Sequence, residues 1–181
     1  KLMGRPRGDY ATINPNDHVN LSQSTNDVYP TAVRLSILRA CPSLIQSQQE
    51  LKDALMQKAV EFDDVIKVGR TQLMDAVPMR LGSEFRAFGV TVGEDVDRLK
   101  EFANLLREVN LGGTAIGTGI NTPGDYPATV IRHLSKVSGV DLITAGDLIE
   151  ATSDMGAFVT FSGVLKRIAV KLSENGLGGS R

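Results

Sequence analysis

The chain has 181 residues, of which 41% are apolar and 23% charged, as expected for one globular domain and not for a disordered or fibrous chain. Its 20 basic and 21 acidic residues are mixed along the sequence, so nothing indicates binding to nucleic acid. No apolar run approaches the roughly 20 residues that span a bilayer, and no leader pattern is present. We therefore expect a cytoplasmic protein without membrane contact.

The residues that bind metals or carry redox chemistry are scarce. Cys41 is the single cysteine and lies in an apolar helical stripe, which favours packing over reactivity. His133 falls in a short amphipathic stretch and is expected at the surface. His18 lies beside polar residues and is the better candidate base, but the two histidines have no metal-ligand spacing. We expect neither a metal nor another cofactor.

Residues 1–27 form a polar lead-in rich in turn-forming residues. From Val33 to Phe62 apolar residues recur mostly three, four or seven apart, which predicts a long helix with a kink at Pro42. Residues 65–78 predict a short extended stretch and a polar loop. The same three-or-four spacing over residues 81–109 predicts a second long helix.

A glycine-rich connection follows at residues 112–124 and resembles a phosphate cradle only loosely, so close passage beside neighbouring helices is the favoured interpretation. A shorter helix is predicted at residues 126–137, ended by Ser138 and Gly139. Residues 148–172 carry a 3.5-residue apolar repeat typical of a helix that packs in a bundle. The glycine-rich tail, residues 174–181, is expected to be a linker or a truncated loop.

These patterns predict an all-α fold, an elongated bundle of long helices in one domain over residues 1–173. No alternation of apolar and polar residues is long enough to predict a sheet. The long helices carry more apolar surface than one chain of this length can bury. We therefore expect self-association through the helices.

Three polar stretches are candidates for chemistry, at residues 22–27, 69–75 and 112–121. Ser24, Thr25 and Asn26 precede the first helix, whose free backbone N–H groups and dipole suit a carboxylate or phosphate. On spacing alone, a simple helix cap is slightly favoured over an anion cradle. At the second stretch, a functional loop and a structural pair between Arg70 and Asp75 are equally supported.

Two longer motifs favour the anion site over a simple helix cap. HVNLSQSTND (residues 18–27) and GRTQLMDAVP (residues 69–78) resemble the first two signature regions of the aspartase/fumarase superfamily, in the same order. GTGINTP (residues 117–123) and DLIEATSD (residues 147–154) resemble the aspartate ammonia-lyase branch more than the fumarate hydratase branch, as does Gln72 after Thr71. The resemblance runs from about residue 8 to about residue 173.

The resemblance implies a set of long helices that four subunits pool into one bundle, so a homotetramer is expected. It also implies elimination of ammonia from L-aspartate to give fumarate. A base removes a proton from C3, and the adjacent carboxylate takes up the charge as an aci-carboxylate. By motif, Ser24 and Thr25 hold the reacting carboxylate and Asn26 the amino group. Thr71 holds the other carboxylate, and Gln72 lies near the amino group.

One signature of the superfamily is absent from these 181 residues. It is a Gly-Ser-Ser-rich loop ending in Met-Pro-x-Lys-x-Asn, which supplies the catalytic serine base and carboxylate-binding groups. We therefore expect the helical core of an aspartase that is inactive alone. A fumarate hydratase core and a non-catalytic helical oligomerisation scaffold remain as alternatives.

Overall fold

The computed structural model describes residues 2–178, with side chains for residues 2–174. The chain divides into two compact units. The first unit takes the residues up to Ser36 together with Leu106–Asp154, and the second takes Ile37–Leu105 together with the residues from Met155 on. Helices dominate both units, so the predicted all-α fold of long helices is confirmed. No described helix has a stretch long and apolar enough to span a bilayer.

Helix α1, Thr25–Glu61, starts within the polar stretch at residues 22–27 and continues from the first unit into the second. Thr25 and Asn26, which we predicted before the helix, therefore lie in its first turn, and only Ser24 precedes it. Pro42 lies inside the helix, which does not end there. Cys41 is buried, as its place in the apolar stripe predicts, and burial raises the pKa of its thiol. The polar lead-in contains one short turn of helix, η1, at Pro15–Val19.

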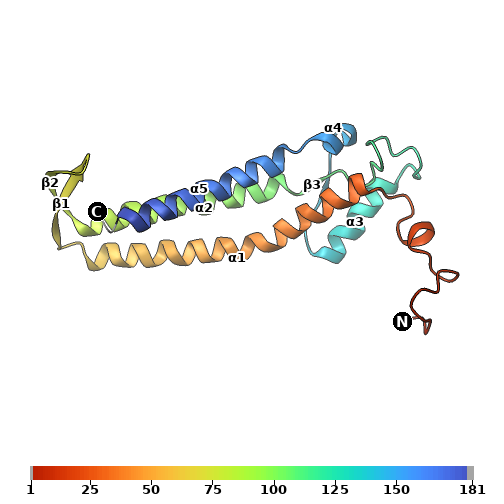
Figure 1. Cartoon of the computed structure of the whole chain (residues 1–181), viewed down its shortest axis with the longest axis horizontal. Coiled ribbons are helices and arrows are strands. Elements are labelled where there is room, and N and C mark those ends of the chain that lie inside the picture. Colours follow the sequence, from red (N-terminus) through yellow and green to blue (C-terminus); the bar gives the residue numbers. More distant parts are fainter. Residues whose placement is uncertain (1, 179–181) are drawn as a thin grey trace. The chain divides into compact units, whose positions relative to one another are not determined.

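The second unit is built on two helices that run side by side, α2 at Leu81–Leu105 and α5 at Gly156–Gly178 (Figure 1). Buried apolar side chains of α2 include Val92 and Leu99, and the Phe102 ring stacks on Phe161 with their centroids 5.8 Å apart. The buried Asp95 carboxylate lies 2.9 Å from Arg167 Nε of α5. A buried charge is costly unless it is paired, and this ion pair compensates the Asp95 carboxylate and links α2 to α5.

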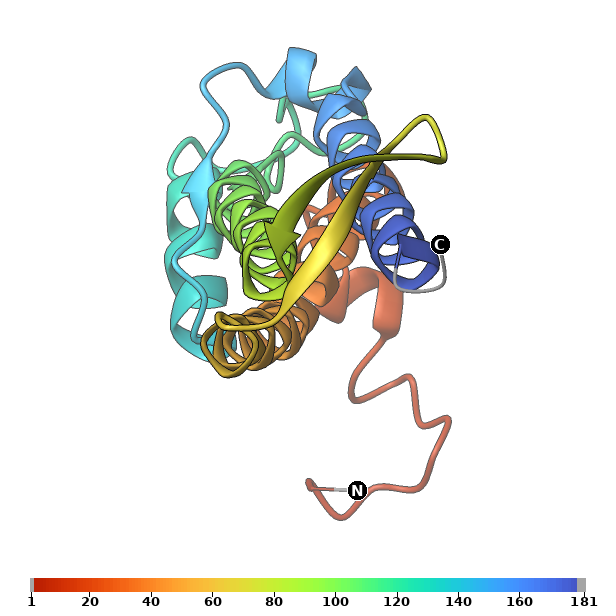
Figure 2. The same cartoon turned by 90° about the vertical axis from the view of Figure 1, so that its left-hand side faces the viewer.

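A β-hairpin joins α1 to α2, where we predicted only an extended stretch and a loop. Strands β1, Ile66–Thr71, and β2, Met74–Arg80, pair antiparallel, with an irregularity in register between Val68 and Arg70 (Figure 2). Lys67 Nζ donates to Glu84 Oε2 at 2.6 Å and ties the hairpin to α2. The alternation that marks a half-buried strand is missing because most of the hairpin is exposed on both faces.

Helix α2 is shorter than predicted, because it ends at Leu105 and not at Val109. Leu106 and Val109 keep the helical spacing and are buried, but they belong to the core of the first unit. There β3, Glu108–Val109, pairs parallel with β4, Ile143–Thr144. The apolar spacing therefore predicted correctly that Leu106 and Val109 are buried, and predicted incorrectly that they are helical.

Helix α3, Tyr126–Ser138, ends as predicted at Gly139, whose φ of 70° is left-handed. The last predicted helix is in fact two, α4 at Leu148–Ser153 and α5 from Gly156. Asp154 between them has extended backbone, and Ser153 Oγ donates back to the Glu150 carbonyl. Short polar side chains compete in this way with helix continuation. Helix α5 extends into the predicted tail as far as Gly178, and residues 179–181 lie outside the described residues.

Candidate functional site

The start of α1 is closed by a reciprocal cap. Ser24 Oγ accepts a hydrogen bond from the Asn26 N–H at 3.2 Å, and Asp27 Oδ1 accepts one from the Ser24 N–H at 2.9 Å. This arrangement is a variant of the capping box, with Asp in the place often taken by Glu and with the hydroxyl bonded to the second N–H of the helix instead of the third. The cap predicted from spacing is therefore present. It uses the Ser24 hydroxyl as an acceptor, so the hydroxyl proton can still be donated to an anion.

Asp27 also links this helix end to the glycine-rich turn at residues 112–119. Its side chain is fully buried, and its Oδ2 accepts hydrogen bonds from the backbone N–H groups of Gly112 and Thr114, both at 3.0 Å. With Ser24, three backbone donors therefore meet one carboxylate. Such donors offset the cost of taking a charged carboxylate out of water.

Two asparagines reinforce the same junction. Asn26 Nδ2 donates to the Ala115 carbonyl at 2.7 Å, and Asn110 Nδ2 donates to the Asn26 carbonyl at 3.0 Å and to Thr152 Oγ1 at 3.1 Å. Asn110 is buried. With its Nδ2 engaged, the Asn26 side chain has Oδ1 as its acceptor. The residues around Asn26 thus hold its backbone and one end of its amide in place.

The glycines of the turn make this junction possible. A Cβ on Gly112 would lie 2.7 Å from Pro127 Cα, and one on Gly117 would overlap the backbone of Leu148 and Ile149. Both glycines have positive φ, 99° and 91°. The predicted close passage of this backbone beside its neighbours is confirmed.

A hollow of about 610 Å³ opens in front of the first turn of α1. Its polar lining consists of hydroxyl, phenol and amide groups and includes Ser24 and Thr25, while no carboxylate lines it. Hydroxyls and amides can donate to an anion, and none of the lining side chains carries a negative charge that would repel one. The lining residues are Asn16, Asn20, Gln23, Ser24, Thr25, Val28, Tyr29 and Ala32.

The second candidate pair, Thr71 and Gln72, lies at the tip of the hairpin in the second unit, and both side chains are exposed. Gln72 and Leu73 form the two-residue turn with positive φ values of 51° and 63°. This turn type usually takes Asn or Gly, and it costs roughly 1–2 kcal/mol per residue for other side chains. Strained backbone persists only where the surrounding structure holds it in place, and it is common at functional sites.

Polar groups also gather beside the hairpin. A hollow of about 850 Å³ is lined by Gln72, Arg70, Lys67 and Glu84 among others. Arg70 Nε lies 3.1 Å from Asp75 Oδ1, so the predicted structural pair exists. Both side chains are exposed, and an exposed ion pair contributes little to stability. The structure therefore places Thr71 and Gln72 in one unit and Ser24, Thr25 and Asn26 in the other.

Two buried or half-buried groups set the electrostatics behind the start of α1. Burial raises the pKa of the Tyr126 phenol; a hydrogen bond with the Gln23 side chain acts in the opposite direction, and the charge of Asp27 adds to the rise. Burial lowers the pKa of the Arg34 guanidinium, against the effect of three nearby carboxylates that include Glu108. Arg34 thus has three carboxylates of the first unit near enough to affect its pKa.

The histidines lie outside these polar clusters. His18 Nδ1 accepts a hydrogen bond from the Asn14 N–H at 2.9 Å within η1. His133 is exposed, as predicted, and borders an apolar groove of about 380 Å³ between α1 and α3 in the first unit. Among the described residues, no group of three or more His, Cys, Asp or Glu side chains could hold a metal ion.

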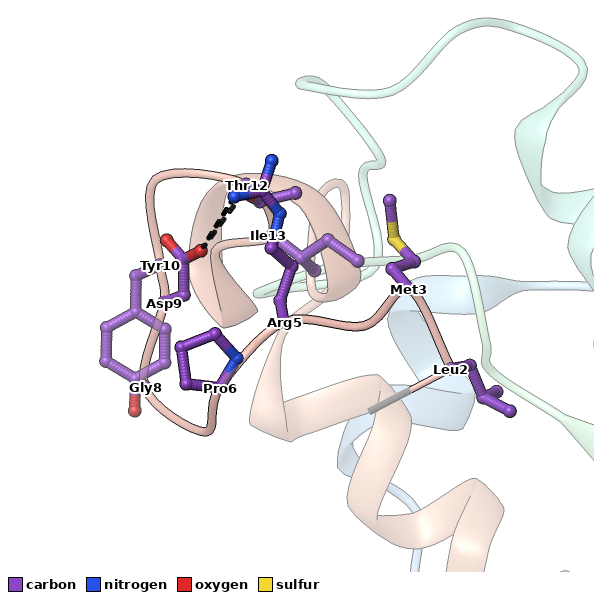
Figure 3. Close-up of a pocket in the computed structure, with 9 residues that line it drawn as sticks. All are labelled: Leu2, Met3, Arg5, Pro6, Gly8, Asp9, Tyr10, Thr12 and Ile13. Carbon is purple, nitrogen blue, oxygen red and sulfur yellow. Dashed lines mark hydrogen bonds and ion pairs between the residues drawn. The ribbon is translucent and has the colours of Figure 1, made fainter.

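A further hollow of about 470 Å³ lies in the lead-in and is lined by residues between Leu2 and Ile13 (Figure 3). Asp9 Oδ2 accepts a hydrogen bond from Thr12 Oγ1 at 3.4 Å and lies 3.9 Å from a guanidinium nitrogen of Arg5. None of the candidate site residues lines it. It is a property of the irregular lead-in and has no evident connection with the start of α1.

Comparison with known proteins agrees with the fold and with the two polar motifs. A family model described as Lyase matches residues 1–176. The chain therefore belongs to this lyase family, within the aspartase/fumarase superfamily.

Three individual relatives are similar to this chain over nearly its whole length. The chain is 58% identical to the aspartate ammonia-lyase of Pseudomonas fluorescens over 96% of its length. It is 59% identical, with a TM-score of 0.92 over 96% of its length, to a fumarate lyase:delta crystallin from Brucella melitensis solved with bound cobalt. The class II fumarase of Schistosoma mansoni is 34% identical, with a TM-score of 0.81 over 90% of the chain.

The chain is much shorter than these relatives. It spans 37% of the Pseudomonas protein, 38% of the Brucella chain and 37% of the Schistosoma chain. It corresponds to the central helical part of the superfamily fold.

Proposed function

We propose that this chain is the central part of an aspartate ammonia-lyase, which converts L-aspartate to fumarate and ammonia. The supporting observation is its 58% identity to an aspartate ammonia-lyase, against 34% to a fumarase, over nearly the whole chain. The hollow at the start of α1, lined by donors and free of carboxylates, suits a dicarboxylate substrate.

In this proposal Ser24 and Thr25 hold the carboxylate next to C3. A base takes the C3 proton, and the electron pair of the C–H bond moves into that carboxylate to form an aci-carboxylate. The pair then returns to form the C2–C3 double bond of fumarate as the C2–N bond breaks and ammonia leaves. Because negative charge grows on the carboxylate oxygens, the Ser24 and Thr25 hydroxyls lower the barrier when they donate to them.

Asn26, Thr71 and Gln72 are assigned to the rest of the substrate. Asn26 Oδ1 accepts from the substrate ammonium, an orientation supported by the hydrogen bond from its Nδ2 to Ala115. Thr71 donates to the other carboxylate. Gln72, whose amide both donates and accepts, lies near the departing nitrogen. The assignment of Thr71 and Gln72 is supported by the motif at residues 69–78 and by the position of both residues at the hairpin tip.

The experiment that tests the proposal is an assay of the complete enzyme for fumarate, with L-aspartate and L-malate as alternative substrates. We expect fumarate from L-aspartate with release of ammonia, and at least tenfold less from L-malate. Fumarate from L-malate alone would identify a fumarate hydratase core. In the same assay the 181-residue chain should form no fumarate, because it lacks the serine-containing loop; turnover near that of the complete enzyme would refute this.

We further propose that the enzyme is a cytoplasmic homotetramer. The supporting observation is the apolar surface left on the long helices, such as Val159, Leu165 and Val170 of α5, which are 70%, 39% and 47% exposed. Light scattering of the complete enzyme measures its mass. A monomer would contradict the assignment and would also argue against the role of a helical oligomerisation scaffold.

A further inference from the structure

We propose that Asp27 is a positioning residue of the lyase, which sets the place of Ser24, Thr25 and Asn26 through its hydrogen bonds to the glycine-rich turn. This role rests on the proposed function, because it concerns the same carboxylate site. Asp27 does not touch substrate in this role. It acts through the donors on the first turn of α1.

A cap alone does not explain the contacts of Asp27. A capping box needs one carboxylate oxygen, and Oδ1 fills that need with the Ser24 N–H at 2.9 Å. Oδ2 faces a segment 85 residues further along the chain and accepts from Gly112 and Thr114, both at 3.0 Å. The side chain is 0% exposed, so its second oxygen is committed to this junction.

The junction holds both the position and the orientation of the first turn of α1. The helix start and the turn are joined by two bonds through Asp27 and one from Asn26 to the Ala115 carbonyl, and Asn110, just before the turn, donates to the Asn26 carbonyl. These bonds are made by Asn26 and Asp27, which follow Ser24 and Thr25 directly in the chain. Donors must stay within a fraction of an ångström of the oxygens on which charge develops, and a displacement of about 1 Å can lower the rate about 10²-fold.

The chemistry of an amide shows what Asp27→Asn would change. An amide has one acceptor oxygen and one NH₂ group, so either orientation presents a donor to an N–H group that needs an acceptor. The first turn of α1 or the glycine-rich turn must then move. Asp27→Glu keeps the negative charge and both acceptor oxygens but is longer by one methylene. It therefore displaces the helix start without removing the carboxylate.

The test measures kcat and KM for L-aspartate in the complete enzyme, per folded protein. For Asp27→Asn we expect kcat to fall about 10²-fold, and for Asp27→Glu about tenfold, while KM changes about threefold or less. The matched control is Asp125→Asn, which removes the same charge from an exposed position without a side-chain cap bond. It should keep kcat within twofold.

The outcomes separate the two claims. If the unmodified enzyme forms no fumarate from L-aspartate, the proposed function fails and this role fails with it. If the unmodified enzyme is active and both Asp27 variants keep kcat within twofold, only the positioning role is refuted, even when their thermal stability drops. Should Asp27→Asn fail to fold, Asp27→Glu decides by the same kcat criterion.

Discussion

Replacing Thr25 with Val is expected to lower kcat for fumarate formation by about 10²–10³-fold in the complete enzyme, the usual effect of losing one donor to a developing oxyanion. Val keeps the branched shape of Thr and removes the hydroxyl. Thr25 is exposed at the first position of α1 and lines the hollow there. Because the carboxylate already carries one negative charge in the substrate and gains a second toward the aci-carboxylate, the hydrogen bond strengthens in the transition state, and kcat should fall more than KM rises.

Thr160→Val is the matched control for this experiment. Thr160 is an exposed threonine of α5, and its hydroxyl donates to the Gly156 carbonyl within its own helix. Its loss should leave kcat and KM within twofold of the unmodified enzyme. A Thr25→Val enzyme with unchanged kcat would contradict the assignment of Thr25 to the reacting carboxylate.

Gly117→Ala is expected to destabilise the chain by about 3 kcal/mol. A φ of 91° costs roughly 1–2 kcal/mol for a residue with a Cβ, and that Cβ would overlap the backbone of Leu148 and Ile149, which adds about 1–3 kcal/mol. The free energy of unfolding can be measured by urea titration monitored by circular dichroism.

Gly124→Ala tests whether this loss is specific. Gly124 belongs to the same glycine-rich connection, its φ is not positive, and a Cβ there would meet nothing within 4 Å. We expect its free energy of unfolding to stay within about 0.5 kcal/mol of the original. Equal losses in the two variants would mean that the connection tolerates no substitution and that close packing at Gly117 is not the cause.

Local signals in the sequence predicted several features correctly. A short polar residue before an apolar helical stripe predicts a helix start, and α1 begins directly after Ser24. Gly139 predicts a helix end, and α3 ends there with left-handed backbone. Each of these features depends on atoms within a few residues of the signal.

Other features depend on contacts that are distant along the chain. Leu106 and Val109 continue the apolar spacing of α2, but Leu106 lies in a turn after the helix and Val109 pairs with Thr144 of β4. Likewise the turn at Gln72 and Leu73 lacks the Asn or Gly that normally predicts a hairpin. Spacing records which residues are buried, and it does not record which partner buries them.

The role of Asp27 is the clearest case of a missed site residue. The pattern from Ser24 to Asp27 fits a capping box and could have identified one hydrogen bond. The bonds to Gly112 and Thr114 join segments more than 80 residues apart and follow only from the folded chain. The candidate substrate residues could be predicted from motifs, whereas the residue that holds them in place could not.

The central claim is that the start of α1 is one wall of a carboxylate site. A crystal structure of the complete enzyme with bound fumarate tests it most directly. We expect one fumarate carboxylate within hydrogen-bond distance of the Ser24 and Thr25 hydroxyls. Fumarate bound elsewhere, with both hydroxyls in contact with water alone, would contradict it.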